Sequence, residues 1–525
     1  MRNVVKIRPN NVREIKPNTA IRIKRIAIVG QGAAGAAAKS ELVRQAIDAG
    51  IAEQLEIFVF EPRESKSDGQ GIAWSASTNS LLVNMPVPTV SFSYGNPREI
   101  GEALGRSMDE EYSSLFPPRK HVGGWLKAFS QSADDIAKIH GIPIFRIEES
   151  VTDIMKTDWG WTLLTPNGQF DADSIVVAIG NIPSTKFSYL RGLPGYMPNV
   201  WEPEKRLQNI GKADDVILLG SSVTAIDAVV TLVENGHHGK ITMLSRHGRL
   251  PGVRVRHDPG YKLRLLSADL LNAAWQATDQ RGLSLEALQA LVLGEFLAAD
   301  VALESLFQTW KLANSPHLAW LGHGLAVMET KSQTFSVLKA LDSIFPDLWH
   351  CLSEGAKREY LQKYHSDYSR IAWPMAPENA RKIYKMLSSG QLKVIGGALD
   401  PFHDGRRFVI PIENGSNVSH KSANILINAT GIGGALDMLD CPLVRNMRQR
   451  GLIHPHKFGG AISDFTTGQL LNSHKKSIGS IYVTAGALNR GERLLTNVLT
   501  EAAESGVRAA QAAFHNMFQQ ISRVA

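Results

Sequence analysis

Three glycines follow an apolar run near the N-terminus, at a spacing that can hold a phosphate group. The run KRIAIV ends in Gly30, Gly32 and Gly35. Gly30 permits a tight turn, Gly32 lets the backbone approach a pyrophosphate, and Gly35 lets the following helix lie close to the strand. That helix begins near Ala33 and Ala34, and its N-terminus attracts phosphates. The spacing predicts a dinucleotide-binding turn.

The segments around this turn are those of a strand–helix–strand unit. A helix is expected to end at Gly50, and LEIFVFEP is typical of a second strand that finishes at Glu61. A carboxylate at this place can accept hydrogen bonds from both hydroxyls of an adenosine ribose. The alternatives are a unit that binds no ligand and a solvated charge at Glu61.

A second strand–helix–strand pattern begins at Asp214, with the sequence DDVILLGSSVTAIDAVVTLVENGHHGKITMLSR. Gly220 opens its turn, whereas Ser222 and Ala225 stand where the other two glycines would be. These small residues still permit close approach, so a second nucleotide site is expected. A purely structural unit is the alternative.

Ser245 and Arg246 end the second strand of this unit, where a site selective for NADH would offer an acid. A hydroxyl and a guanidinium suit the 2′-phosphate of NADPH instead, and Arg249 is close enough in sequence to assist. We therefore expect NADPH rather than NADH. The alternative is that Arg246 is one more exposed charge.

Three other β-rich segments close on glycine. They are DSIVVAIG, which ends at Gly180, ANILINATG, which ends at Gly431, and SIGSIYVTAG, which ends at Gly486. Such strand ends let the chain pass close to a bound cofactor, although each is also compatible with an ordinary core strand. A short loop and a long amphipathic helix are expected after Gly486.

Composition bounds the class of protein. The 525 residues are 43% hydrophobic and 20% charged, with a net charge of +7, as in an ordinary globular protein. The positive charge is not gathered into basic runs with interleaved aromatics, and no apolar stretch has spanning length, so neither nucleic acid nor a membrane is expected. The two cysteines, Cys351 and Cys441, form no CxxC, which favours a reducing cytoplasm. Neither histidine pair, 237–238 or 454–456, has the company of a metal site.

Between about 254 and 385 the apolar spacing becomes helical and predicts a helical insertion. Its aromatic residues are expected in the core rather than in a cofactor site, although some can line a substrate site. They include Phe345, Trp349, Tyr360, Tyr364 and Tyr368.

The order of these motifs resembles the flavoproteins with two dinucleotide-binding domains. Within them, the chain is similar to bacterial FAD/NAD(P)-binding proteins. The resemblance rests on the runs GQGIAW (69–74), LLVNMP (81–86), FPPRKHVGGWL (116–126), LSRHGRLPG (244–252) and DLWHCL (347–352). It implies FAD in the first domain, NADPH in the second, and Asn84 beside the flavin ring. Asn84 as the cap of a turn before Pro86 is the alternative.

The chain departs from this pattern at two places. Ala487 follows Gly486 where an aspartate often contacts the flavin ribityl chain, and an arginine-rich patch is reduced to Arg370. The resemblance implies that charge on the reduced flavin would be met by the helix after Gly491 and by the amides of Leu488 and Asn489.

The expected fold is α/β, with two Rossmann-like dinucleotide-binding domains, the second inserted in the first, and a helical insertion. A flexible basic extension is expected at 1–23, the first part of the FAD domain at 24–205, the NADP domain at 206–390, and the return part of the FAD domain at 391–525.

The resemblance implies an FAD-dependent, NADPH-using oxidoreductase. The leading hypothesis is a monooxygenase that acts through a C4a-hydroperoxyflavin on an amine or sulfur of a small molecule. The alternatives are an NADPH-dependent flavin reductase or dehydrogenase and a non-catalytic, FAD-binding redox sensor. Neither the catalytic side chains nor the oligomeric state can be assigned from the sequence.

Overall fold

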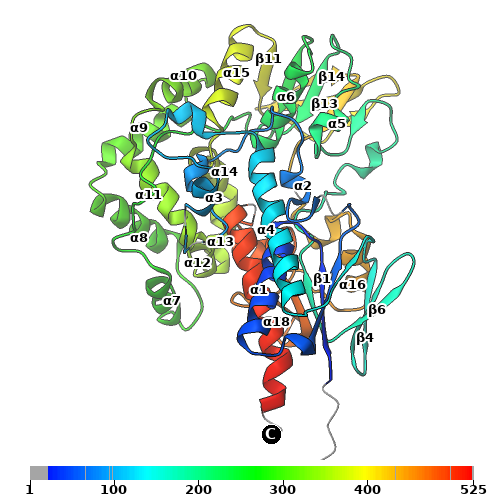
Figure 1. The fold of residues 1–525 in the computed structure, drawn as a ribbon. Coiled ribbons are helices and arrows are strands. Elements are labelled where there is room, and N and C mark those ends of the chain that lie inside the picture. Colours follow the sequence, from blue (N-terminus) through cyan, green and yellow to red (C-terminus); the bar gives the residue numbers. More distant parts are fainter. Residues whose placement is uncertain are drawn as a thin grey trace, which may run out of the picture.

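The computed structural model describes residues 22–64, 67–93, 95–96, 98–431, 433–496 and 498–522. The expected basic extension therefore lies outside the described residues except for its last two positions. The described chain forms two parallel-type sheets with helices packed on them, two small antiparallel sheets and a helical region (Figure 1).

The first sheet has the strand order β16-β17-β7-β1-β2-β3, and every neighbouring pair is parallel except β16 with β17. Its strands are β1 (Lys24–Val29), β2 (Leu55–Phe60), β3 (Ile144–Ile147), β7 (Ser174–Val177), β16 (Gln469–Leu471) and β17 (Ser477–Val483). Parallel strands buried on both faces read as continuous apolar runs, which explains KRIAIV and LEIFVF.

Helices α1 (Ala33–Asp48), α4 (Arg119–Ile139) and α18 (Leu499–Ser522) run side by side on one face of this sheet (Figure 1). Gly506 permits the contact between α18 and α1, because a Cβ at Gly506 would lie 2.1 Å from the Ala34 carbonyl oxygen. The other face is covered by the sheet of β4 (Asp153–Thr157), β5 (Gly160–Leu164) and β6 (Gln169–Ala172), and by α16 (Pro442–Gln449). The first and last segments of the chain thus build one unit.

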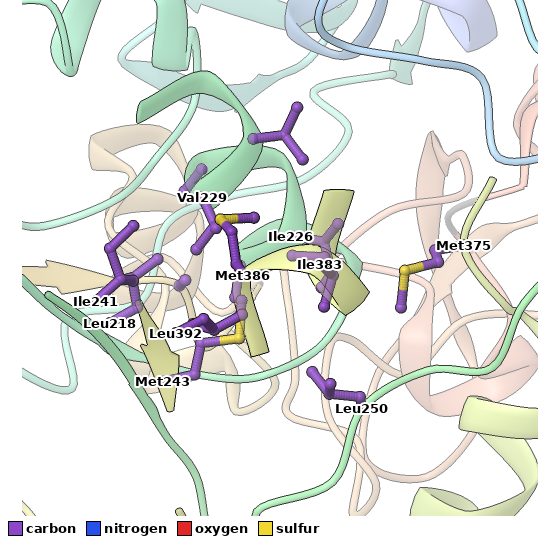
Figure 2. Packing of buried hydrophobic residues seen from close by; sticks show 14 of the residues in the cluster. Leu218, Ile226, Val229, Ile241, Met243, Leu250, Met375, Ile383, Met386 and Leu392 are labelled. Carbon is purple, nitrogen blue, oxygen red and sulfur yellow. The ribbon is translucent and has the colours of Figure 1, made fainter. Parts of the chain in front are cut away.

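The second sheet has the order β11-β10-β9-β15-β8, with all its pairs parallel. Its strands are β8 (Tyr196–Met197), β9 (Val216–Leu219), β10 (Ile241–Leu244), β11 (Leu392–Ile395) and β15 (Ile425–Asn428). Helices α6 (Val223–Glu234) and α15 (Pro377–Ser388) cover one face. Figure 2 shows side chains of this core, among them Val229, Met243 and Met386.

This sheet corrects the expected domain boundaries. Strands β8, β11 and β15 belong to the second sheet, so the boundaries at 205/206 and 390/391 are wrong. The second unit reaches from 196 to 428, and the return to the first sheet begins after β15. A hairpin sheet of β12 (Phe402–His403), β13 (Phe408–Asn414) and β14 (Asn417–Ala423) lies between β11 and β15.

The helical region lies between β10 and α15. It contains α7 (Ala268–Gln276), α8 (Leu285–Ala298), α9 (Leu303–Ala313), α10 (His317–Val327), α11 (Gln333–Leu341), α12 (Phe345–His350), α13 (Glu354–Glu359), a π-helical turn (Tyr360–Tyr364) and α14 (His365–Ala372). The expected end at 385 is too late, because α15 packs on α6 and β11 as a crossover helix of the second unit. The helical region packs on Leu494 and Leu495 of the first unit.

The chain after β17 also differs from the expectation of one short loop and one long helix. A four-residue helix, α17 (Arg490–Arg493), comes first and ends where Leu494 adopts φ 51°. The long helix α18 starts only at Leu499. Further short helices are α2 (Gly71–Trp74), α3 (Glu99–Ala103) and α5 (Pro203–Arg206). In the described part of the chain, none of the helices combines the length and apolar character that crossing a membrane requires.

Candidate functional site

The first glycine turn connects β1 to α1. Gly30 has φ +101°, its amide donates to the Phe60 carbonyl oxygen at 2.8 Å, and a Cβ there would lie 2.5 Å from the Ala178 carbonyl oxygen. A Cβ at Gly35 would lie 2.0 Å from the Gly30 carbonyl oxygen. Gly32 caps α1, which starts at Ala33 and continues through Ala34. The turn therefore presents bare backbone at a helix N-terminus, as a pyrophosphate site requires.

The second turn has the same construction. Gly220 has φ +119°, its amide donates to the Leu244 carbonyl oxygen at 2.7 Å, and a Cβ there would lie 2.3 Å from the Ala429 carbonyl oxygen. Ser222 occupies the position of Gly32 as the N-cap of α6, without a side-chain capping hydrogen bond. Ala429 and Ala178 follow equivalent strands, β15 and β7. Each unit thus holds its glycine turn against the strand beside it.

The glycine-ended strands reach these turns. Gly486 has φ +131°, and there is no room for a side chain, because a Cβ there would lie 2.4 Å from the Gly180 carbonyl oxygen. The ends of β7 and β17 therefore touch in the first unit. Gly431 follows β15 in the second unit and has φ +88°, with no atom within 4 Å of a Cβ. Each glycine turn therefore has the end of a glycine-terminated strand beside it, as the strand patterns predict.

Glu61 lies at the end of β2 and is buried. Its carboxylate accepts from the Gln31 amide at 3.0 Å and from Arg63, whose Nε and Nη2 lie at 2.8 and 2.9 Å. Burial would raise the pKa of Glu61, but the bonds from Arg63 and Gln31 outweigh it and lower the pKa. A ribose would therefore have to share this carboxylate with Arg63. Sequence reasoning missed Arg63, although its place two residues after Glu61 was a signal.

The segment GQGIAW covers the first turn. The Gly69 amide donates to the Gln31 carbonyl oxygen at 2.8 Å, and a Cβ on Gly71 would lie 3.2 Å from the Gly32 Cα. A Cβ on Gly69 would lie 2.2 Å from the Leu126 carbonyl oxygen. The two glycines of this run thus allow the chain to pass between the turn and α4.

The segment that contains Asn84 is held by its backbone. Arg119 Nε donates to the Leu82 carbonyl oxygen at 3.1 Å, and Arg254 Nε donates to that of Asn84 at 2.9 Å. The Asn84 side chain has no hydrogen-bond partner among the described residues, so the structure does not show it capping the turn before Pro86. Its amide remains available to a ligand.

Arg119 also joins the two units. Its Nη2 lies 2.7 Å from Oδ2 of Asp227, which is on α6 of the second unit and is buried. Burial raises the pKa of Asp227, and Arg119 opposes that shift. One guanidinium therefore binds both the segment beside Asn84 and the helix that follows the second glycine turn.

The end of β10 partly corrects the expected phosphate site. The Ser245 hydroxyl accepts the Gly248 amide at 2.9 Å and shares a hydrogen bond with the Ser221 hydroxyl at 2.9 Å. Arg249 is paired with Asp367 of α14. Arg246 is exposed, and its side chain has no partner among the described residues. Of the three candidates, Arg246 is the one whose whole side chain is unengaged among the described residues, whereas Arg249 shares its guanidinium with Asp367.

The turn after Gly486 brings Leu488 and Arg490 to the same region. Leu488 is buried, and its carbonyl oxygen accepts the Ala461 amide at 2.7 Å. The sequence predicts a long helix after Gly491 whose dipole would stabilise charge on the flavin. Instead, α17 has only four residues, and the long helix α18 begins nine residues after Arg490, so that dipole is not available here. Burial lowers the pKa of Arg490, and its guanidinium has no partner in the described parts of the chain. Sequence reasoning missed Arg490, which is marked by partial burial and by the absence of a partner among the described residues.

The helical region closes this end of the site. Trp349 Nε1 donates to the Gly491 carbonyl oxygen at 2.8 Å, and Phe345 and Trp349 are buried in its core, as predicted. Tyr364 is 41% exposed, so it does not belong to that core. Arg370 donates to the Ala313 carbonyl oxygen and to Asn314 Oδ1, which makes it a structural residue rather than an anion site.

The cysteines and metal ligands add no further chemistry. Burial raises the pKa of Cys351 to about 11 and also raises that of Cys441, so neither thiol is ionised at neutral pH. The described residues contain no group of three or more His, Cys, Asp or Glu side chains placed to hold a metal ion.

Comparison with known proteins identifies the first unit. Residues 27–182 match a family model described as FAD-NAD(P)-binding. These residues include the first glycine turn and Glu61, so the predicted cofactor class, FAD and NAD(P), is that of the matching family. A search of curated proteins found no match.

Solved structures share the fold of nearly the whole chain. L-lysine 6-monooxygenase from Pseudomonas syringae has a TM-score of 0.54 at 16% identity, over 94% of this chain and 99% of that one. Ornithine N-hydroxylase from Kutzneria sp. 744, with reduced FAD, NADP+ and L-ornithine, has a TM-score of 0.53 at 12% identity, over 94% and 100%. Reduced ornithine hydroxylase from Pseudomonas aeruginosa has a TM-score of 0.53 at 11% identity, over 95% and 100%. The predicted fold, with two dinucleotide-binding units of flavoprotein type, is confirmed.

Proposed function

We propose that the protein is an FAD-dependent, NADPH-using oxidoreductase, and that it acts as a monooxygenase on an amine or sulfur of a small molecule. The observation that carries this proposal is the pair of equivalent glycine turns. A Cβ on Gly30 would lie 2.5 Å from the Ala178 carbonyl oxygen, and a Cβ on Gly220 would lie 2.3 Å from the Ala429 carbonyl oxygen. A single binding unit would serve one cofactor, whereas two units can bring a reductant to a bound flavin.

The residues present fit these cofactors. The bare backbone from Gly30 to Gly35 suits the FAD pyrophosphate, with Glu61 and Arg63 at the adenosine end and the Asn84 amide at the ring. Gly220 and Ser222 suit the NADPH pyrophosphate, with Arg246 at the 2′-phosphate. Bound FAD supplies two-electron chemistry, and the chain supplies position and electrostatics.

The residues around the flavin place act by orientation and by charge. Arg119 and Arg254 fix the backbone on either side of Asn84, so its amide can donate from a defined position. The Leu488 amide lies at the end of β17, where the flavin acquires charge on reduction. The helical region packs on Leu494 and Leu495 beside this end, and we expect it to limit the access of water, as oxygen transfer requires.

The proposal of oxygen transfer has two supports. The described structures with the same fold are named as monooxygenases and hydroxylases of lysine and ornithine. The chain also has no cysteine pair for dithiol reduction, since Cys351 and Cys441 are far apart in sequence and both thiols are held neutral. An NADPH-dependent flavin reductase is the second candidate, because the same two sites serve it equally well.

The test is the fate of electrons after flavin reduction. NADPH consumption, oxygen uptake and hydrogen peroxide release are measured together, with and without small amines and thioethers. A monooxygenase releases less peroxide per NADPH when its substrate is present, because oxygen enters the product. Peroxide release that equals NADPH consumption with every compound, combined with fast electron transfer to a quinone, would assign the protein as a reductase.

A further inference from the structure

The helix that runs from α13 to α14 contains one π-helical turn, Tyr360–Tyr364. Single π turns are rare and are frequently found at functional sites. This turn sets Tyr360 and His365 on one face, with ring centroids 5.6 Å apart. Tyr360 Oη and His365 Nδ1 are both buried, and neither has a hydrogen-bond partner in the described part of the chain. Two unpartnered polar atoms on neighbouring rings could take a polar group of another molecule as their partner.

Aromatic rings surround these two atoms. Tyr360, His365, Trp373 and Tyr368 form a closed ring of neighbours, with centroid separations of 5.6, 6.3, 5.5 and 6.4 Å around it. All four side chains are partly rather than fully buried. We call these four residues the π-turn cluster. It combines apolar ring surface with two free hydrogen-bonding atoms.

The charge beside the π-turn cluster is positive. Burial, and after it the nearby charges of Arg490 and Arg246, lower the pKa of His365 to about 4. Partial burial lowers the pKa of Arg490, and none of the described carboxylates pairs with its guanidinium. Asp342 hydrogen-bonds Trp373 Nε1 at 3.3 Å, but it is paired with Lys339. The charges that act on His365 are thus the guanidinium groups of Arg490 and Arg246.

The π-turn cluster borders the proposed flavin site. The Trp349 and Tyr360 ring centroids lie 6.2 Å apart, and Trp349 binds the Gly491 carbonyl oxygen, next to Arg490. Arg246 comes from the end of β10 in the second unit. The cluster therefore lies where the helical region meets both dinucleotide-binding units.

We propose that the π-turn cluster and Arg490 form the substrate subsite, and that this subsite takes the carboxylate of an aromatic or similarly apolar small molecule. This inference rests on the proposed function. Arg490 would pair with the carboxylate, Tyr360 and His365 would donate hydrogen bonds to it, and Tyr368 and Trp373 would pack on the apolar part. Two nearby guanidinium groups disfavour a cationic group at the same place.

The test uses three probes of one shape: benzoate, benzamide and benzylamine. Binding is followed by tryptophan fluorescence of the full-length protein, since Trp373 lies in the cluster. We expect benzoate to bind about tenfold or more tightly than benzamide, and benzylamine to bind more weakly than either. This readout needs neither bound FAD nor turnover, and flavin content is measured in the same samples. A protein without flavin would refute the proposed function while the benzoate result still decides the inference.

Matched variants locate the site. Tyr360→Phe should weaken benzoate binding about three- to tenfold, whereas Tyr364→Phe, on the exposed side of the same turn, should leave it unchanged. Arg490→Gln should weaken it about tenfold or more, and Arg358→Gln, on the exposed surface of α13, should not. If Arg490→Gln does not fold, the tyrosine pair alone decides the result.

The inference is overturned by equal benzoate affinity in Tyr360→Phe and Tyr364→Phe, or by benzylamine binding more tightly than benzoate. It is also overturned if Arg490→Gln weakens NADP+ binding and leaves benzoate binding unchanged, because Arg490 would then serve the dinucleotide.

Discussion

Gly30 and Gly32 are two residues apart in the first turn, but an alanine at each should have a different effect. Gly30 has φ +101°, and an added Cβ would lie 2.5 Å from the carbonyl oxygen of Ala178, which belongs to the chain beside β1. A Cβ on Gly32 would meet only Gly71 Cα at 3.4 Å, which is an ordinary contact. The first substitution therefore strains the protein, whereas the second only occupies space needed by a ligand.

The magnitudes follow from these contacts. A non-glycine residue at the Gly30 conformation costs about 1–3 kcal/mol, and the overlap with Ala178 costs about the same again. Gly30→Ala should thus lose roughly 2–6 kcal/mol of stability, or roughly 4–24 °C in Tm at about 2–4 °C per kcal/mol. Gly32→Ala changes only a helix N-cap, which is worth about 1 kcal/mol or less.

The assay separates stability from binding. Thermal unfolding is measured on flavin-free protein, and FAD affinity is measured by fluorescence titration. Gly32→Ala should melt within a few degrees of wild type and bind FAD about tenfold or more weakly, since about 1.4 kcal/mol is one factor of ten. Gly124→Ala, at an exposed helical position with nothing near its Cβ, is the control that should change neither. Wild-type FAD affinity in Gly32→Ala would refute the placement of the pyrophosphate.

Three other expectations follow from the site. Arg246→Gln should raise the KM for NADPH about tenfold and leave the KM for NADH unchanged. Arg249→Gln should not alter the ratio of these two KM values. An equal effect of Arg246→Gln on both cofactors would contradict the 2′-phosphate role. Arg119→Gln should destabilise the protein by about 2–4 kcal/mol in urea unfolding, because it leaves Asp227 buried and unpaired. The double variant Arg119→Gln with Asp227→Asn should recover most of that loss. No recovery would argue against the ion pair. His257 is 4% exposed, and burial lowers its pKa from 6.5 to about 3. Because the unfolded chain takes up the proton first, the free energy of unfolding falls as the pH drops below 6.5, by roughly 2–3 kcal/mol at about pH 4.5. His257→Gln should remove that share of the pH dependence of stability, and an unchanged pH profile would count against it.

The first dinucleotide unit could be predicted because its signals are local. The strand before Gly30, the helix after it and the strand that ends at Glu61 follow one another within forty residues, so each element predicts its neighbour. The boundaries of the second unit could not be predicted in this way. Strand β11 pairs with β10, although the whole helical region separates the two strands in the sequence. A short apolar run such as LKVI does not indicate which of the two sheets it joins.

Side-chain roles were predictable only where no neighbour competes for the same group. Ser245 has the residue type of a phosphate ligand, but the Gly248 amide three residues later binds its hydroxyl, as is common for serine in turns. Glu61 is where the strand pattern predicts it, and Arg63 already occupies part of its carboxylate. Arg490 has no sequence signal, because what marks it is a partly buried guanidinium without a partner among the described residues, which only the packed structure shows.

A flavin in the first unit is expected to receive its electrons from NADPH in the second. The most direct measurement mixes the purified, FAD-loaded protein with NADPH or NADH without oxygen and follows the visible flavin absorbance in a stopped-flow instrument. Rapid bleaching by NADPH, at a rate that saturates with its concentration and exceeds that with NADH, is the predicted result. A flavin that stays oxidised under saturating NADPH would contradict the account.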